Sequence, residues 1–271
     1  MGTPTMVSVV GVWLSVVGVT MGDMDELDAQ LQPPQECVAW CRAQDYALVV
    51  GDDIAPVDLD WWNTHLADHK IGVRLWGRDA DGRPVDSGAA FLRRDDLPTG
   101  VLPEQGPREL GVLYRGAAWL AGHPRRPRVK RFIDVRTPVA GRELDTILGG
   151  LRLCTDQHLL GGGRGDCAPW PATPGVGPAL LSLYCWAVLP EVVERPQLLD
   201  QNSLSTLCHL GWLHTPSLPA FTRRGYLRYC QLLHSWAGQV GVPAELVEMW
   251  LSSNWQHRVR AAGQHISTDA G

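Results

Sequence analysis

Apolar residues recur every three or four positions along most of the chain, which is the spacing of helices with one buried face. Between residues 223 and 240 such steps form one stripe made of Tyr226, Tyr229, Cys230, Leu233, Trp236, Ala237 and Val240. The same spacing predicts helices over residues 33–45, 59–69, 109–120, 141–153 and 243–251. Asp60 is the expected cap of the second of these, which carries Trp61 and Trp62 on its apolar side. The pattern therefore predicts a mainly α-helical protein.

One stretch departs from helical spacing. Residues 71–92 alternate between apolar and polar positions and turn at Asp81-Gly82, a pair that favours tight hairpin turns. We expect a small β-hairpin inserted here into the helical body. Beyond residue 255 the sequence becomes polar, so residues 256–271 are expected to form a frayed tail.

The first residues raise a separate question. Residues 6–20 are almost entirely apolar, but this stretch is too short to span a bilayer and lacks the positive flank of a signal peptide. Two interpretations stay open: a translated upstream extension, with the true start at Met21 or Met24, and a buried strand. The expected organisation is residues 1–20 as an extension, 21–108 as a helical segment with the hairpin, and 109–255 as the main helical domain, without a membrane partner.

Composition narrows the class of protein. A chain of 271 residues with 45% hydrophobic residues can bury a sizeable core. Its seven cysteines are an odd number without regular spacing, which favours reduced thiols in the cytoplasm over a disulfide framework. Cys37 and Cys41 lie one helical turn apart, but no second pair completes a ligand set. We expect them to pack in the core and expect neither a metal nor a cofactor.

Charge is distributed unevenly. Residues 23–60 contain ten acids and one base, whereas residues 123–142 contain seven bases and one acid, Asp134. An anionic partner could therefore dock on the middle of the chain although the formal net charge is −5. A solvated basic face without a partner is the alternative.

Residues 173–207 read TPGVGPALLSLYCWAVLPEVVERPQLLDQNSLSTL. The glycines at 175 and 177 permit a tight turn and close approach to another molecule, and the helix that follows directs its first N–H groups outward. Such an end suits a phosphate, although a plain turn explains the same residues. Asp200 follows an apolar run and stands where a helix cap belongs, a position that also presents an acid at the start of the helix.

The order of these features resembles the helix-hairpin-helix DNA glycosylase superfamily. Three further segments are similar to bacterial proteins with an 8-oxoguanine DNA glycosylase type of fold: LYRGAAWLAGHPRRPRVKRFIDV, RPQLLDQNSLSTL and RRGYLRYCQLLHSWAGQVGVPAELVEMWL. WWNTHLADH, at 61–69, corresponds to their early paired-tryptophan helix. The resemblance covers residues 115–251 and implies a two-lobed helical body.

What the resemblance implies for function can be stated residue by residue. Asp200 would be the carboxylate that acts at the anomeric carbon of a flipped nucleotide, in double-stranded DNA bound by a monomer. The phosphate contacts would come from the turn and from the basic stretch: Gly175, Val176, Gly177, Ala179, Arg125, Arg126 and Arg128. Aromatic side chains would line the pocket that receives the extruded base. The candidates are Trp119, Trp186, Tyr184 and Trp170.

Two departures from the family pattern limit the chemistry. Members with lyase activity carry a lysine just after the hairpin, where Pro178 and Ala179 stand here, so a monofunctional hydrolase is expected. The stretch GGGRGDCAPWPAT before the turn is also unsuited to a helix running into it. A non-catalytic DNA-binding or protein-interaction module on the same helical body is the alternative. Burial of Asp200, or its pointing away from the basic stretch, would count against its catalytic role.

Overall fold

The computed structural model describes residues 31–102, 106–127, 142–155, 170–171 and 173–268. From residue 32 onward the described chain forms one compact unit. The expectations for residues 1–20 and for Arg128 lie outside the described residues. None of the helices in these ranges combines the length and the apolar character that crossing a bilayer requires.

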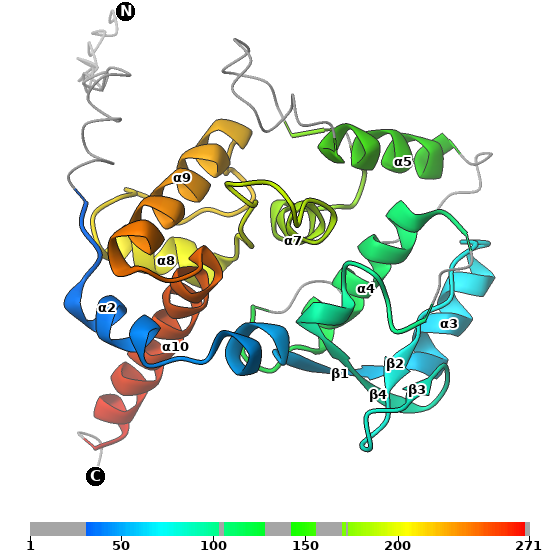
Figure 1. Ribbon diagram of the computed structural model, residues 1–271, viewed down its shortest axis with the longest axis horizontal. Helices are drawn as coiled ribbons and strands as arrows, with labels where there is room; N and C mark the ends of the chain where they lie inside the picture. Colours follow the sequence, from blue (N-terminus) through cyan, green and yellow to red (C-terminus); the bar gives the residue numbers. More distant parts are fainter. Residues whose placement is uncertain (1–30, 103–105, 128–141, 156–169, 172, 269–271) are drawn as a thin grey trace, which may run out of the picture. The chain divides into compact units, whose positions relative to one another are not determined.

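The described chain is mainly helical with one small sheet, as its sequence pattern predicts (Figure 1). Its α-helices are α2 (Gln35–Arg42), α3 (Leu59–Asp68), α4 (Arg108–Gly122), α5 (Arg142–Thr155), α7 (Pro178–Val188), α8 (Gln201–His209), α9 (Arg223–Val240) and α10 (Ala244–Thr268). A π-helical turn, η1 (Ala47–Gly51), and a 3₁₀ turn, η2 (Arg94–Asp96), flank the sheet. Helix α9 has the predicted bounds, and its apolar stripe is buried.

The hairpin expected between residues 71 and 92 belongs to a four-stranded antiparallel sheet with the order β1-β4-β2-β3. The strands are β1 (Ile54–Asp58), β2 (Gly77–Arg78), β3 (Pro84–Val85) and β4 (Ala89–Arg93). Gly82 has a φ of 81° at the predicted turn between β2 and β3. The sequence pattern missed β1, which contains Pro56. That residue is tolerated because β1 is an edge strand and needs no donor on its free side.

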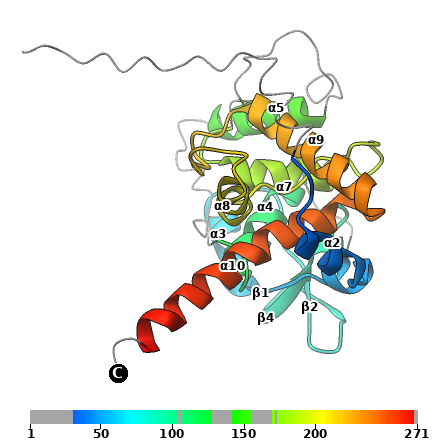
Figure 2. The same ribbon diagram turned by 90° about the vertical axis from the view of Figure 1, so that its left-hand side faces the viewer.

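Two further expectations differ in detail. The cap of α3 is Asp58, whose carboxylate accepts a hydrogen bond from the Trp61 amide at 3.1 Å, and not Asp60, which lies inside the helix. Helix α10 does not end near residue 251 but continues to Thr268 (red in Figure 2). Residues 244–252 are buried, and residues 257–262 of the extension are exposed. This extension replaces a frayed tail over residues 256–268.

The core lies where α4 packs against α7 on one side and against β1 on the other. Figure 1 shows α4 in green between these two elements. Helices α8, α9 and α10 pack together beside them, with α2 against α10. Cys37 and Cys41 are buried at 0% and 1% exposure, which confirms the core packing expected for them.

Candidate functional site

Asp200 is the N-cap of α8, as its sequence position predicts. One carboxylate oxygen, Oδ1, accepts a hydrogen bond from the Ser203 amide at 2.7 Å. The other oxygen, Oδ2, accepts hydrogen bonds from the Ser252 hydroxyl at 2.8 Å and from Nη1 of Arg126 at 3.0 Å. The residue is only 2% exposed. Its carboxylate therefore points toward the basic stretch, but it is enclosed by its partners.

The segment that leads into Asp200 is fixed by α9. The hydroxyls of Tyr226 and Tyr229 donate to the carbonyls of Gln197 and Leu198 at 2.9 and 2.8 Å. Burial, reinforced by the negative charges of Glu248 and Asp200, raises the pKa of Tyr229, so its hydroxyl remains a donor. Two buried tyrosines of α9 thus set the direction in which α8 begins.

Arg126 connects Asp200 to a second buried carboxylate, that of Glu248 in α10. Its Nη1 contacts Oε1 of Glu248, and its Nη2 lies 3.2 Å from Oε2. Arg94 donates to the same Oε2 at 2.8 Å. Burial alone would lower the pKa of Arg126, but the charges of Glu248 and Asp200 raise it. All four side chains are at most 2% exposed, so each charge depends on its partners rather than on water.

The loop that carries Arg126 is held by a third acid, Asp53, which is 1% exposed. Its Oδ1 lies 2.8 Å from Nε2 of His123 and 2.6 Å from Nη2 of Arg125. The Arg125 amide donates to Nδ1 of His123 at 3.1 Å, so Nε2 carries the ring proton and donates to Asp53. Burial would raise the pKa of Asp53, but the hydrogen bond from His123 and the charge of Arg126 hold it at about 2.

The lowered pKa of Asp53 predicts that the stability of the fold depends on pH in the acidic range. Because the folded pKa of Asp53 is about 2 and its ordinary value is 3.8, the carboxylate stabilises the fold above pH 4. The contribution, about 2 kcal/mol, is lost as the pH falls through 4 toward 2. Urea unfolding at pH 5 and at pH 3 should show about half of this loss, about 1 kcal/mol, in the wild type and a smaller one in Asp53→Asn. Equal losses of stability in the wild type and in Asp53→Asn would show that the Asp53 carboxylate is not the source of this pH dependence.

The glycine turn before α7 is exposed. Gly175 has a φ of 75°, in the left-handed region that favours glycine, and the Val176 amide donates to the Thr173 carbonyl at 3.0 Å. Gly177 is the N-cap of α7, without a side-chain capping bond, and Pro178 occupies the first turn. Val176 packs on the core, and Ala179 is buried. The backbone at 175 and 177 is thus open to a ligand, whereas Ala179 is buried.

Comparison with protein families gives one match. The model described as "Putative 8-oxoguanine DNA glycosylase OGG-like protein" matches residues 50–252, which is most of the chain. The chain belongs to this OGG-like family. Neither the curated proteins nor the solved structures that were searched gave a match.

The OGG-like match runs from η1 to the middle of α10, so it includes the sheet, the buried acids and the glycine turn. It also extends beyond the residues 115–251 over which the sequence resemblance was drawn. Asp53, Arg94 and Glu248 lie within it, and periodicity identified none of them as site residues. The one available signal was the acidic bias of residues 23–60 opposite the basic bias of residues 123–142.

The expected base-pocket residues of this OGG-like protein lie in its core. Trp119, Tyr184 and Trp186 are at most 1% exposed. The Trp186 ring is enclosed between the guanidinium groups of Arg94 and Arg195, at 4.4 and 3.9 Å from its centroid. In this arrangement the three aromatic residues present no open face to a base, so their role as pocket lining stays a prediction.

The two described arginines of the predicted phosphate site differ in exposure. The Arg125 side chain is 57% exposed, whereas that of Arg126 is 2% exposed and ion-paired. In this arrangement two buried carboxylates hold Arg126, so its contact with a phosphate stays a prediction. No group of three or more His, Cys, Asp or Glu side chains in the described ranges is arranged to hold a metal ion.

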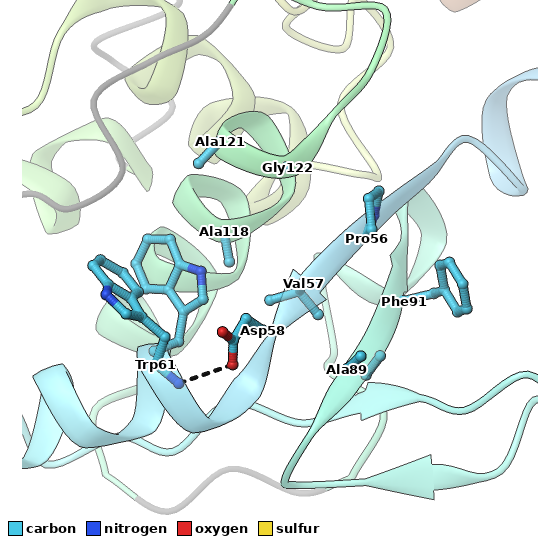
Figure 3. A pocket seen from close by; sticks show the side chains of 11 residues that line it. Pro56, Val57, Asp58, Trp61, Ala89, Phe91, Ala118, Ala121 and Gly122 are labelled. Carbon is cyan, nitrogen blue, oxygen red and sulfur yellow. Dashed lines mark hydrogen bonds between the residues drawn. The ribbon is translucent and has the colours of Figure 1, made fainter.

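A pocket of about 410 Å³ that the sequence did not indicate lies beside β1 (Figure 3). Trp61 and Trp62 form one wall, small side chains at the end of α4 form another, and Phe91 lies on the outer side of β4. None of the predicted site residues lines it. This pocket is consequently distinct from the surroundings of Asp200.

Proposed function

We propose that this protein is a monofunctional DNA glycosylase that hydrolyses the N-glycosidic bond of a damaged or modified base flipped out of double-stranded DNA. Membership of the OGG-like family supports DNA as the partner. The observation that carries the proposal is the position of Asp200, which begins α8 downstream of the exposed glycine turn. This order is that of the helix-hairpin-helix glycosylases.

The chemistry follows from the charge that develops in the reaction. Breaking the N-glycosidic bond builds positive charge on the deoxyribose, and a fixed carboxylate nearby stabilises that charge or activates the attacking water. The Ser203 amide and the Ser252 hydroxyl orient the two oxygens of Asp200.

Access to Asp200 requires a rearrangement, because its Oδ2 is taken by Arg126. Glu248 contacts the same guanidinium through both of its oxygens, so Arg126 retains a carboxylate partner if it withdraws from Asp200. We infer that binding of the extruded nucleotide separates Arg126 from Asp200 while the Arg126–Glu248 pair persists. The sugar would then occupy the side of Oδ2 from which Arg126 has moved.

A DNA-binding protein without catalysis on the same helical body is the second candidate. It is favoured by one observation, the burial of Asp200 at 2% exposure with all its hydrogen bonds made within the protein. In that case Asp200 is only a helix cap and a partner for Arg126. The two candidates share the glycine turn and the family, and they differ in whether a base is released.

The deciding assay uses duplexes that each carry one modified base, beginning with 8-oxoguanine, and detects the free base by mass spectrometry. We expect release of the base from at least one duplex. The strand should remain intact until alkali is added, and borohydride should trap no covalent adduct, because Ala179 stands where lyases carry their lysine. Absence of base release from every duplex would leave the non-catalytic DNA-binding protein as the conclusion.

A further inference from the structure

Among the described residues, α9 offers a cationic surface in addition to the exposed Arg125 side chain. This helix carries three arginines and no Asp or Glu. Within the described ranges, Arg223 and Arg224 are partly exposed and have no acid within ion-pair distance. Other arginines are paired with acids, namely Arg74, Arg78, Arg83, Arg93, Arg94, Arg125, Arg126, Arg152 and Arg195. The two guanidinium groups at the start of α9 therefore carry charge that no acid in the described part of the chain offsets.

The start of α9 is attached to the segment that enters the glycine turn. Nε1 of Trp170 donates to the carbonyl of Phe221 at 2.8 Å, and the Trp170 ring packs on Tyr226 with centroids 4.9 Å apart. Phe221 is two residues before Arg223, and Trp170 is three residues before Thr173, where the turn begins. These contacts place the first turn of α9 next to the segment that leads into the glycine turn.

A second set of contacts joins the same region to α8. Gln201, the first residue of α8, donates to the Pro216 carbonyl and accepts from the Leu218 amide at 3.3 Å. Tyr226 binds the carbonyl of Gln197, three residues before Asp200. The first turn of α9 is thus connected both to the glycine turn and to the segment that carries Asp200.

We propose that Arg223 and Arg224 bind the phosphates of DNA and extend the binding surface from the glycine turn toward Asp200. This inference rests on the proposed function and adds a surface to it. Guanidinium groups bind phosphate oxygens through paired hydrogen bonds. The neighbouring Arg228 is engaged differently, since its guanidinium lies over the Trp212 ring at 5.3 Å.

The test measures binding of an unmodified duplex by fluorescence anisotropy from ~50 to ~300 mM salt. Each phosphate contact contributes about 0.9 to the slope of log affinity against log salt, so Arg223→Gln/Arg224→Gln should lower that slope by about 2. Affinity at low salt should fall about tenfold or more. Arg223→Lys/Arg224→Lys keeps both charges and should retain most of the slope.

The matched control is Arg258→Gln/Arg260→Gln, which removes two exposed charges from the outer half of α10 (Figure 2). It should leave the slope near that of the wild type. Thermal unfolding should show that both double variants are folded, because neither removes an ion pair seen among the described residues. If Arg223→Gln/Arg224→Gln has the same slope and affinity as the wild type, the inference is wrong, although the protein still binds DNA. If the wild type itself binds no duplex, the proposed function fails together with it.

Discussion

Asp200→Asn is expected to reduce base release by about 10²–10⁴-fold while the protein still folds and binds DNA. Asparagine is as good a helix cap as aspartate, so its side-chain oxygen can still accept from the Ser203 amide. The substitution removes the negative charge that would stabilise the sugar cation, and with it the Oδ2 acceptor of the hydrogen bonds from Arg126 and Ser252. The measurement is single-turnover release of the base at saturating enzyme, with affinity for the same duplex determined separately.

Asp58→Asn is the matched control for this experiment. Asp58 caps α3 through the Trp61 amide as Asp200 caps α8, and it lies outside the buried cluster of acids and arginines. We expect Asp58→Asn to release base at the wild-type rate. If Asp200→Asn is as active as Asp58→Asn, Asp200 is a cap without a catalytic role. If Asp200→Asn has lost DNA binding as well, the defect is structural and Asp200→Glu, which retains the charge, becomes the comparison.

The experiment is needed because Asp200 is buried, which the sequence did not predict. Position in the sequence predicted the cap correctly, because capping depends on local backbone geometry and on one side chain. It could not predict that Arg126 and Ser252 would enclose the carboxylate. Those residues lie 74 positions before and 52 positions after Asp200 in the chain. Contacts between residues so distant are decided by packing, which periodicity does not report.

Parts of the fold that depend on local sequence were predictable, whereas parts that depend on contacts between distant residues were not. Helix α9 was predicted to the residue, because its apolar stripe is long and Thr222 and Gly241 terminate it with a cap and a left-handed residue. Strand β1 was missed because Pro56 argues against a strand unless the strand is known to lie at an edge. The sheet order that makes β1 an edge strand is itself a long-range property.

The sequence could not predict which charged residues lie at the surface and which are buried. Seven bases between residues 123 and 142 suggested one basic surface, yet Arg126 is buried and Arg125 is bound to Asp53. A count of charges along the chain cannot distinguish an arginine that faces solvent from one that neutralises buried acids. Conversely, Arg223 and Arg224 attract no attention as a charge run, and only their lack of acidic neighbours in the described structure makes them candidates for DNA contact.

The substitution with the largest expected effect on stability is Arg126→Met. Among the described residues, it leaves the buried carboxylate of Glu248 with Arg94 as its remaining cation in direct contact and that of Asp200 with none. Removing one partner of a buried ion pair costs about 3–5 kcal/mol, because the other charge stays in a poorly solvated site. Urea unfolding should show this loss, with a smaller one in Arg126→Lys, which retains the charge but not the paired geometry.

Adding Glu248→Gln to Arg126→Met should restore part of the lost stability, because the double variant removes one buried charge of each sign and so returns the cluster to balance. Arg83→Met provides the contrast, since the Arg83–Asp81 pair is 74% and 68% exposed and should contribute less than about 1 kcal/mol. If Arg126→Met unfolds like Arg83→Met, Arg126 is not the cation that compensates Asp200 and Glu248. If instead the double variant is less stable than Arg126→Met, Glu248 is stabilised mainly through Arg94, and the coupling between Arg126 and Glu248 is small.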